Sequence, residues 1–151
     1  YSKLDYDNAK FQFESISSSY EGTESEVLSK YYLGKIAYEL GNLNEAKNFL
    51  IDFLDNAKDA TLICGAIKRL VDISSNENDF LKSLEIITKA KKFDINNVSK
   101  LELELLKINT LIKMNDLQGA KIEVEKVLNN KKLPSNIEQK INEFEGLLSA
   151  L

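Results

Sequence analysis

The chain has 151 residues, of which 43% are apolar, and this is enough for one domain with a hydrophobic core. Its 24 acidic and 20 basic residues give a net charge of -4, which argues against a general affinity for nucleic acid or for anionic membranes. Because it has no histidine and a single cysteine, Cys64, it cannot form an intrachain disulfide, a Cys/His metal site or a histidine-based catalytic triad.

A small residue recurs every 37 positions, each time four residues after an acidic or amide residue. These small residues are Ala9, Ala46, Ser83 and Ala120. Large apolar residues keep the same period at Phe13, Leu50, Ile87 and Val124. A period in the thirties that is built from two helices is typical of helical solenoids, in which each unit buries its apolar face against the next. We therefore expect an all-α fold, a right-handed α-solenoid of antiparallel helix pairs with about eight helices.

The period divides the chain into helix pairs. One domain, residues 1–151, is expected to contain a half repeat, three whole repeats and a C-terminal capping helix. Their limits are 5–19 for the half repeat, 24–55, 60–91 and 98–130 for the whole repeats, and 135–150 for the capping helix. The chain begins at Tyr1 rather than at a methionine, so we expect a trimmed fragment in which the half repeat has lost its partner helix. The apolar face of the remaining helix is then expected to be uncovered.

The first whole repeat has the clearest helix signals. Thr23 and Glu26 predict a capping box at the start of its first helix. Gly41 predicts the C-cap at the end of that helix. The helix is apolar around most of its circumference, so we expect neighbouring helices on several sides of it. Small residues are expected where the two helices of the pair approach closely, at Gly34, Ala37 and Ala46.

The later repeats carry weaker signals, and we interpret the second whole repeat as degenerate because its turn, residues 75–78, lacks the glycine. In the third whole repeat Asn97 suits an N-cap. Pro134 stops the repeating pattern, and Ser135 with Glu138 predicts a second capping box. The last helix has a single apolar stripe, which suits the end of a solenoid. This stripe consists of Ile137, Ile141, Phe144 and Leu148.

The residues in the helices and the turn of the first whole repeat match a known helix-turn-helix sequence pattern. The matching residues are Leu33-Gly34, Gly41-Asn42-Leu43 and Glu45-Ala46, followed by Leu50. In this pattern the chain resembles the tetratricopeptide repeat family, whose usual period is about 34 residues. It departs from the family in its period of 37, in having no tryptophan, and in having no proline at the repeat ends except Pro134. These departures indicate the longer, irregular branch of the family.

Residues 9–46 are also similar to bacterial envelope proteins of this superfamily. These include the ancillary subunit of the secretory translocon and the lipoproteins of outer-membrane assembly. The resemblance implies a periplasmic or membrane-anchored location in the bacterial envelope, with the cytoplasm as the alternative. The sequence has no run of about eighteen apolar residues, so we expect no direct membrane insertion by this fragment.

The resemblance further implies a concave groove, lined by one face of the first helix of each repeat. The residues expected to contact a partner there are Leu28, Tyr31, Lys35, Tyr38, Glu39, Lys68, Asp72, Asn76, Leu105, Asn109, Ile112 and Lys113. Tyr31 and Tyr38 are the strongest candidates because tyrosine combines a broad apolar face with a polar rim. Packing against the neighbouring repeat is the alternative role for both. The lysine and asparagine pattern with which some relatives hold the terminal carboxylate of a chaperone is not reproduced.

The expected function is a non-catalytic scaffold that binds a peptide or partner protein, without nucleic acid, metal or cofactor. The sequence has no glycine-rich phosphate loop, and paired carboxylates such as Glu102 and Glu104 are expected to be solvated charge on helix faces. Two alternatives stay open. The first is a structural module that forms a homo-oligomer through its exposed repeat ends, and the second is a regulatory helical domain of a larger protein, including an enzyme.

Overall fold

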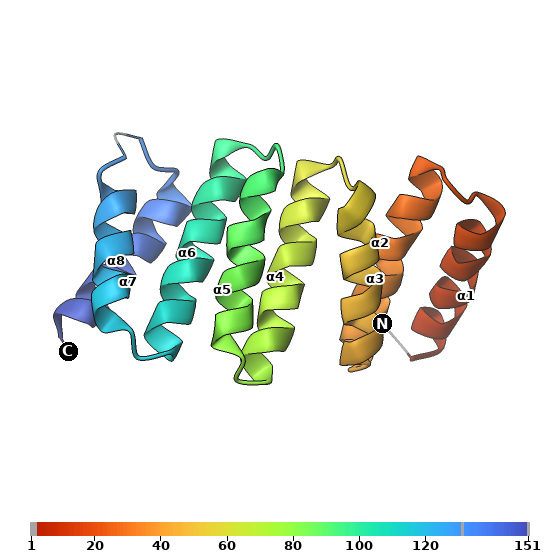
Figure 1. Cartoon of the computed structure of the whole chain (residues 1–151), viewed down its shortest axis with the longest axis horizontal. Coiled ribbons are helices and arrows are strands. Elements are labelled where there is room, and N and C mark those ends of the chain that lie inside the picture. Colours follow the sequence, from red (N-terminus) through yellow and green to blue (C-terminus); the bar gives the residue numbers. More distant parts are fainter. Residues whose placement is uncertain (1–2, 131, 151) are drawn as a thin grey trace. The chain divides into compact units, whose positions relative to one another are not determined.

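The computed structural model describes residues 3–130 and 132–150, and helix is the regular secondary structure in these ranges. It forms eight α-helices and one short 3-10 turn (Figure 1). Their bounds are α1 Lys3–Ser19, α2 Glu24–Glu39, α3 Leu43–Asn56, α4 Ala60–Asn76, α5 Phe80–Lys89, η1 Ala90–Lys92, α6 Asn97–Lys113, α7 Leu117–Leu128 and α8 Ser135–Ser149. The all-α class and the expected number of helices are confirmed.

Two compact units divide the chain. Unit 1 is Tyr1–Ile73 and unit 2 is Ser74–Leu151, so the division falls in the last turn of α4. Within unit 1, α2 contacts α1 and α3, and it also packs against α4 through a cluster of Ala37, Ala46 and Ile73. The expectation that this helix has neighbours on several sides is therefore confirmed.

The closest approach between two helices in unit 1 lies where α2 meets α3. A Cβ atom added to Gly34 would lie 2.7 Å from Leu50 Cγ and 3.3 Å from the Leu50 backbone nitrogen. Leu50 is fully buried, so it has little space into which to move. Gly34 is thus small because α3 passes over it, as the sequence predicts.

The same turn joins the two helices of every whole repeat. In each turn one residue has a positive φ, namely Gly41 at 79°, Asn78 at 59° and Asn115 at 63°. The next backbone N–H donates to the carbonyl five residues earlier, at 2.8 Å in the first two turns and 2.9 Å in the third. This is the Schellman arrangement, in which asparagine can replace glycine. Interpreting the second turn as degenerate was therefore wrong, because Asn78 takes the conformation that Gly41 takes.

The period of 37 is also visible in burial. The small residue in the first turn of each second helix is fully buried in all three whole repeats, at Ala46, Ser83 and Ala120. Asp79 and Asp116 cap the helices that contain the last two, each accepting a hydrogen bond from the backbone N–H three residues later, at 3.0 and 2.9 Å. Asn42 stands at the equivalent position without a side-chain cap bond.

Replacing Asn115 with alanine is expected to destabilise the protein by about 1 kcal/mol, because alanine lacks the local hydrogen bonds that let asparagine tolerate a positive φ. Asn115→Gly is expected to be neutral or slightly stabilising. Urea unfolding followed by circular dichroism measures both changes. Asn142→Ala is the matched control, since Asn142 is an exposed residue inside α8. If Asn115→Ala were as stable as Asn142→Ala, the turn would not depend on this residue.

The core of unit 2 is formed by α6, α7 and α8. It includes the whole predicted stripe of the last helix, Ile137, Ile141, Phe144 and Leu148, which is confirmed as buried. The neighbouring Leu147 is 47% exposed. The polar remainder of α8 faces solvent, as expected for a helix with one apolar face.

Three capping predictions need correction. Thr23 caps α2 as predicted, because its side chain accepts from Glu26 N. Glu26 also returns to the start of α2, but its carboxylate accepts from Gly22 N at 2.6 Å, because Thr23 N already donates to the Tyr20 carbonyl. Asn96, rather than Asn97, caps α6 by accepting from Ser99 N at 2.9 Å.

The capping box predicted at the start of α8 is absent. Pro134 occupies the N-cap position without a side-chain hydrogen bond, and its carbonyl accepts from Ile137 N and Glu138 N, both at 2.9 Å. Ser135 is already inside the helix and cannot act as the cap. Proline fixes φ near the value of a helix start, which explains why the helix begins directly after it.

Candidate functional site

The predicted groove residues divide into three groups by exposure. Exposed side chains are those of Leu28, Lys35, Glu39, Lys68, Asn76 and Lys113. Half-buried side chains are those of Tyr38, Asp72, Leu105, Asn109 and Ile112. Tyr31 is buried, with 7% of its surface exposed. The structure therefore leaves every predicted contact residue except Tyr31 at least partly accessible.

Tyr31 belongs to the packing of unit 1 rather than to a free surface, which corrects its predicted role. Its ring centroid lies 5.2 Å from that of Phe53 and 5.4 Å from that of Tyr32. The guanidinium of Arg69 lies 5.9 Å from the centre of the same ring. A tyrosine surrounded in this way serves as packing against the next helix, which was the alternative role.

Arg69, which the sequence did not single out, connects α2 to α4. Its guanidinium lies 5.9 Å from the rings of both Tyr31 and Tyr38, within the range of cation–π attraction. Both of its hydrogen bonds leave from Nη1, to the Gly65 carbonyl at 3.1 Å and the Tyr31 hydroxyl at 3.5 Å. Its Nε is buried without a hydrogen-bond partner. The guanidinium thus retains unused hydrogen-bonding capacity beside the predicted groove residues.

Tyr38 and Asp72 are two predicted groove residues that the structure brings together. The Tyr38 hydroxyl donates a hydrogen bond to the Asp72 carboxylate. This hydrogen bond, followed by burial, raises the pKa of the Tyr38 hydroxyl. This hydrogen bond therefore links α2 to α4, and both side chains are half-buried.

Tyr38→Phe is expected to lower the free energy of unfolding by about 1 kcal/mol at neutral pH, since the Asp72 carboxylate loses a donor. Because the folded-state pKa of Tyr38 is raised, the stabilisation is fully present below the unfolded pKa near 10 and is lost as pH rises through the folded pKa. Urea unfolding of both proteins at neutral and alkaline pH measures this. Tyr20→Phe is the control, since the Tyr20 side chain is exposed. If Tyr38→Phe and Tyr20→Phe lowered the free energy of unfolding equally, the Tyr38–Asp72 hydrogen bond would not be a source of stability.

The contacts between α2 and α4 do not follow the sequence period. Tyr38 meets Asp72, 34 residues on, and Tyr31 meets Arg69, 38 residues on. Both contacts run in the same order along the two helices, which is the relation of parallel neighbours. Adding 37 to Tyr31 therefore predicted Lys68 as the next groove residue. A shift of 38 would have identified Arg69, which contacts Tyr31.

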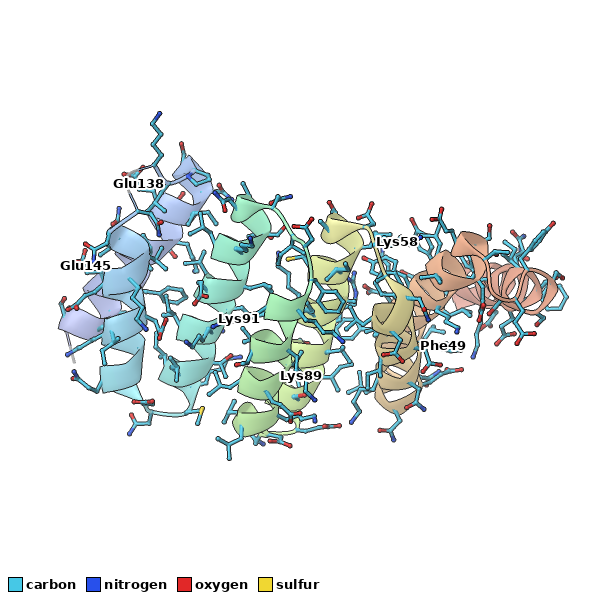
Figure 2. The ribbon with its side chains drawn as sticks, turned by 45° about the horizontal axis from the view of Figure 1, so that its top comes forward. Phe49, Lys58, Lys89, Lys91, Glu138 and Glu145 are labelled. Carbon is cyan, nitrogen blue, oxygen red and sulfur yellow. The ribbon has the colours of Figure 1, made fainter. Side chains whose placement is uncertain are left out.

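A cavity of about 450 Å³ opens where the N-terminal turns of α2 and α4 meet the end of α3. Apolar side chains from all three helices line it, namely Val27, Leu28, Phe53 and Leu62. Above them an ion pair joins Lys58 Nζ to Glu24 Oε1 at 3.2 Å. Figure 2 shows Lys58 in the segment between α3 and α4. Only Leu28 of the cavity residues was predicted to contact a partner.

The predicted residues of unit 2 lie on α6. Leu105 and Ile112 are half-buried and pack against the core of this unit. Asn109 lies between them on the helix, and Lys113 is exposed. These side chains form the rim of the core, so the stronger candidate site lies in unit 1.

Residues 3–130 and 132–150 contain no group of three Asp, Glu or Cys side chains placed to bind a metal ion. No helix in the same ranges has the length and apolarity to cross a membrane. Comparison of the chain with protein-family models, curated proteins and solved structures finds no significant match.

Proposed function

We propose that the chain is a non-catalytic scaffold that binds a segment of a partner protein, and that its helix pairs stack as a right-handed solenoid of the tetratricopeptide type. The partner lies along the first helices of the repeats. Two features support the stacking. The three turns at Gly41, Asn78 and Asn115 have the same backbone geometry, and α2 and α4 of unit 1 are parallel neighbours.

The observation that carries the proposal is the accessible surface between α2 and α4. Most large apolar side chains of α2 are buried or half-buried. Leu28, by contrast, is 41% exposed and borders the cavity. Lys35 is exposed and has no ion-pair partner among the described residues. An exposed leucine at the edge of a cavity, together with an unpaired cation, is typical of a surface that binds another molecule.

A peptide-display selection on the whole chain tests the proposal. We expect it to enrich peptides that bind, and the bound peptide to slow amide hydrogen exchange in α2 and α4. Failure to enrich any peptide above a blank surface would count against a peptide-binding scaffold. Protection confined to α3, α5 and α7 would place the binding surface on the second helices instead.

Self-association is a second candidate, favoured by Phe11. This side chain is 70% exposed on α1, and α1 has no fully buried side chain between residues 5 and 19. A large exposed aromatic residue on such a helix suits contact with another copy of the chain. Light scattering should then show an oligomer that Phe11→Ser dissociates. A monomer at every concentration would rule this candidate out.

A further inference from the structure

Several polar groups that line the cavity of unit 1 are already paired within the chain. Thr23 Oγ1 donates to the Tyr20 carbonyl and accepts from Glu26 N, while Asp59 Oδ1 accepts from Leu62 N. The Glu26 carboxylate is paired with Lys30 at 2.8 Å. Beside these paired groups the lining includes apolar side chains, of which Leu28 is exposed. A ligand would therefore gain most by burying an apolar group there.

Two cations stand two helical turns beyond the cavity on α2 and α4, two of the helices that line it. Leu28 and Lys35 are seven residues apart on α2, and Leu62 and Arg69 are seven residues apart on α4. Residues seven apart lie on nearly the same side of a helix. The distance along the axis is about 10 Å, from a rise of 1.5 Å per residue.

The chemistry of these cations favours a carboxylate. Lys35 is exposed without an ion pair in the part of the chain that the structure describes. The half-buried Arg69 makes its hydrogen bonds among the described residues from Nη1, so its Nη2 has no hydrogen-bond partner there. Guanidinium groups bind carboxylates through two parallel hydrogen bonds, and the flanking tyrosine rings hold this one in place.

We propose that unit 1 recognises an extended partner segment through two points, a large apolar side chain in the cavity and an acidic side chain against Lys35 and Arg69. An extended chain advances about 3.3 Å per residue, so the two side chains are about three residues apart. This inference rests on the proposed function and gives the partner a sequence character. The acidic group is a side chain within the segment, since nothing in the site requires a chain terminus.

The same display selection tests this motif when the peptides are fused so that they have no free C-terminal carboxylate. We expect the enriched peptides to share an aromatic or large aliphatic residue and an Asp or Glu about three positions away. For the consensus peptide, made as an amide, Leu28→Asp should weaken binding at least about tenfold and Lys35→Glu at least about threefold.

Matched controls come from unit 2. Leu147→Asp alters a leucine of similar exposure, and Lys121→Glu makes the same charge change on α7, which is a second helix. Both should leave the affinity of the consensus peptide unchanged. Circular dichroism of each variant checks that the helices are retained.

Three outcomes would overturn the motif. They are a consensus without an acidic residue, a consensus with Lys or Arg in its place, and binding that is insensitive to Leu28→Asp. In each of these the chain still binds peptides, so the scaffold proposal stands while the motif fails. Absence of any enriched peptide would contradict both.

Discussion

Gly34→Val is expected to lower the free energy of unfolding by about 3 kcal/mol. The new side chain would overlap the buried Leu50, whose Cγ lies 2.7 Å from where the Cβ atom would stand. Inserting atoms into a packed core usually costs about 1–3 kcal/mol, and a branched side chain in contact with backbone lies at the upper end. Urea unfolding followed by circular dichroism gives the change in midpoint.

Two further variants separate overlap from the general effect of altering a helical glycine. Gly146→Ala in α8 has no atom within 4 Å of the added Cβ, so it should stabilise by up to about 1 kcal/mol through helix propensity. Leu50→Ala introduced beside Gly34→Val should cost less than Leu50→Ala alone, because the smaller side chain relieves the overlap. Strictly additive losses for the pair would show that the two residues do not interact.

Phe53→Ala should also be strongly destabilising, by about 3–5 kcal/mol, because it leaves a cavity in the core of unit 1. Phe53 is buried, and its ring packs 5.2 Å from that of Tyr31. It also forms part of the lining of the cavity near Leu28. The loss would be measured by urea unfolding, with the Tyr31 environment followed by near-ultraviolet circular dichroism.

Phe49→Ala is the control for this prediction. Phe49 lies one turn earlier on α3, is half-buried and can be seen in Figure 2. The same truncation should cost less than half as much there, because fewer atoms surround the ring. If Phe49→Ala cost as much as Phe53→Ala, the packing around Tyr31 would not be the main source of stability.

The period of 37 made the helix pairs predictable, and the small residues of the first whole repeat made the close contact at Gly34 predictable. The period is visible because another helix packs closely against Ala46, Ser83 and Ala120, so each of these positions needs a small residue. The second whole repeat was misjudged because the missing glycine in its turn was taken as a sign of degeneracy. Asparagine also tolerates a positive φ, so the turn persists.

The site was harder to predict than the fold. α2 is apolar around most of its circumference, and a sequence does not tell which of its tyrosines faces another helix. Tyr31 proved buried while Tyr38 stayed half-exposed. Arg69 and the cavity depend on contacts between α2 and α4 that are 34 to 38 residues apart, so a fixed offset of 37 missed them.

The shared geometry of the three turns bears on how such a chain changes length during evolution. Gly41, Asn78 and Asn115 have the same backbone conformation, and each is followed by the N-cap residue of the next helix. If residues 42–78 were deleted, Gly41 would be joined to Asp79, and the new turn would have the geometry of the old ones. Duplication of one period preserves the turns in the same way. Whole periods of 37 residues are therefore the units of insertion and deletion that the local backbone accommodates.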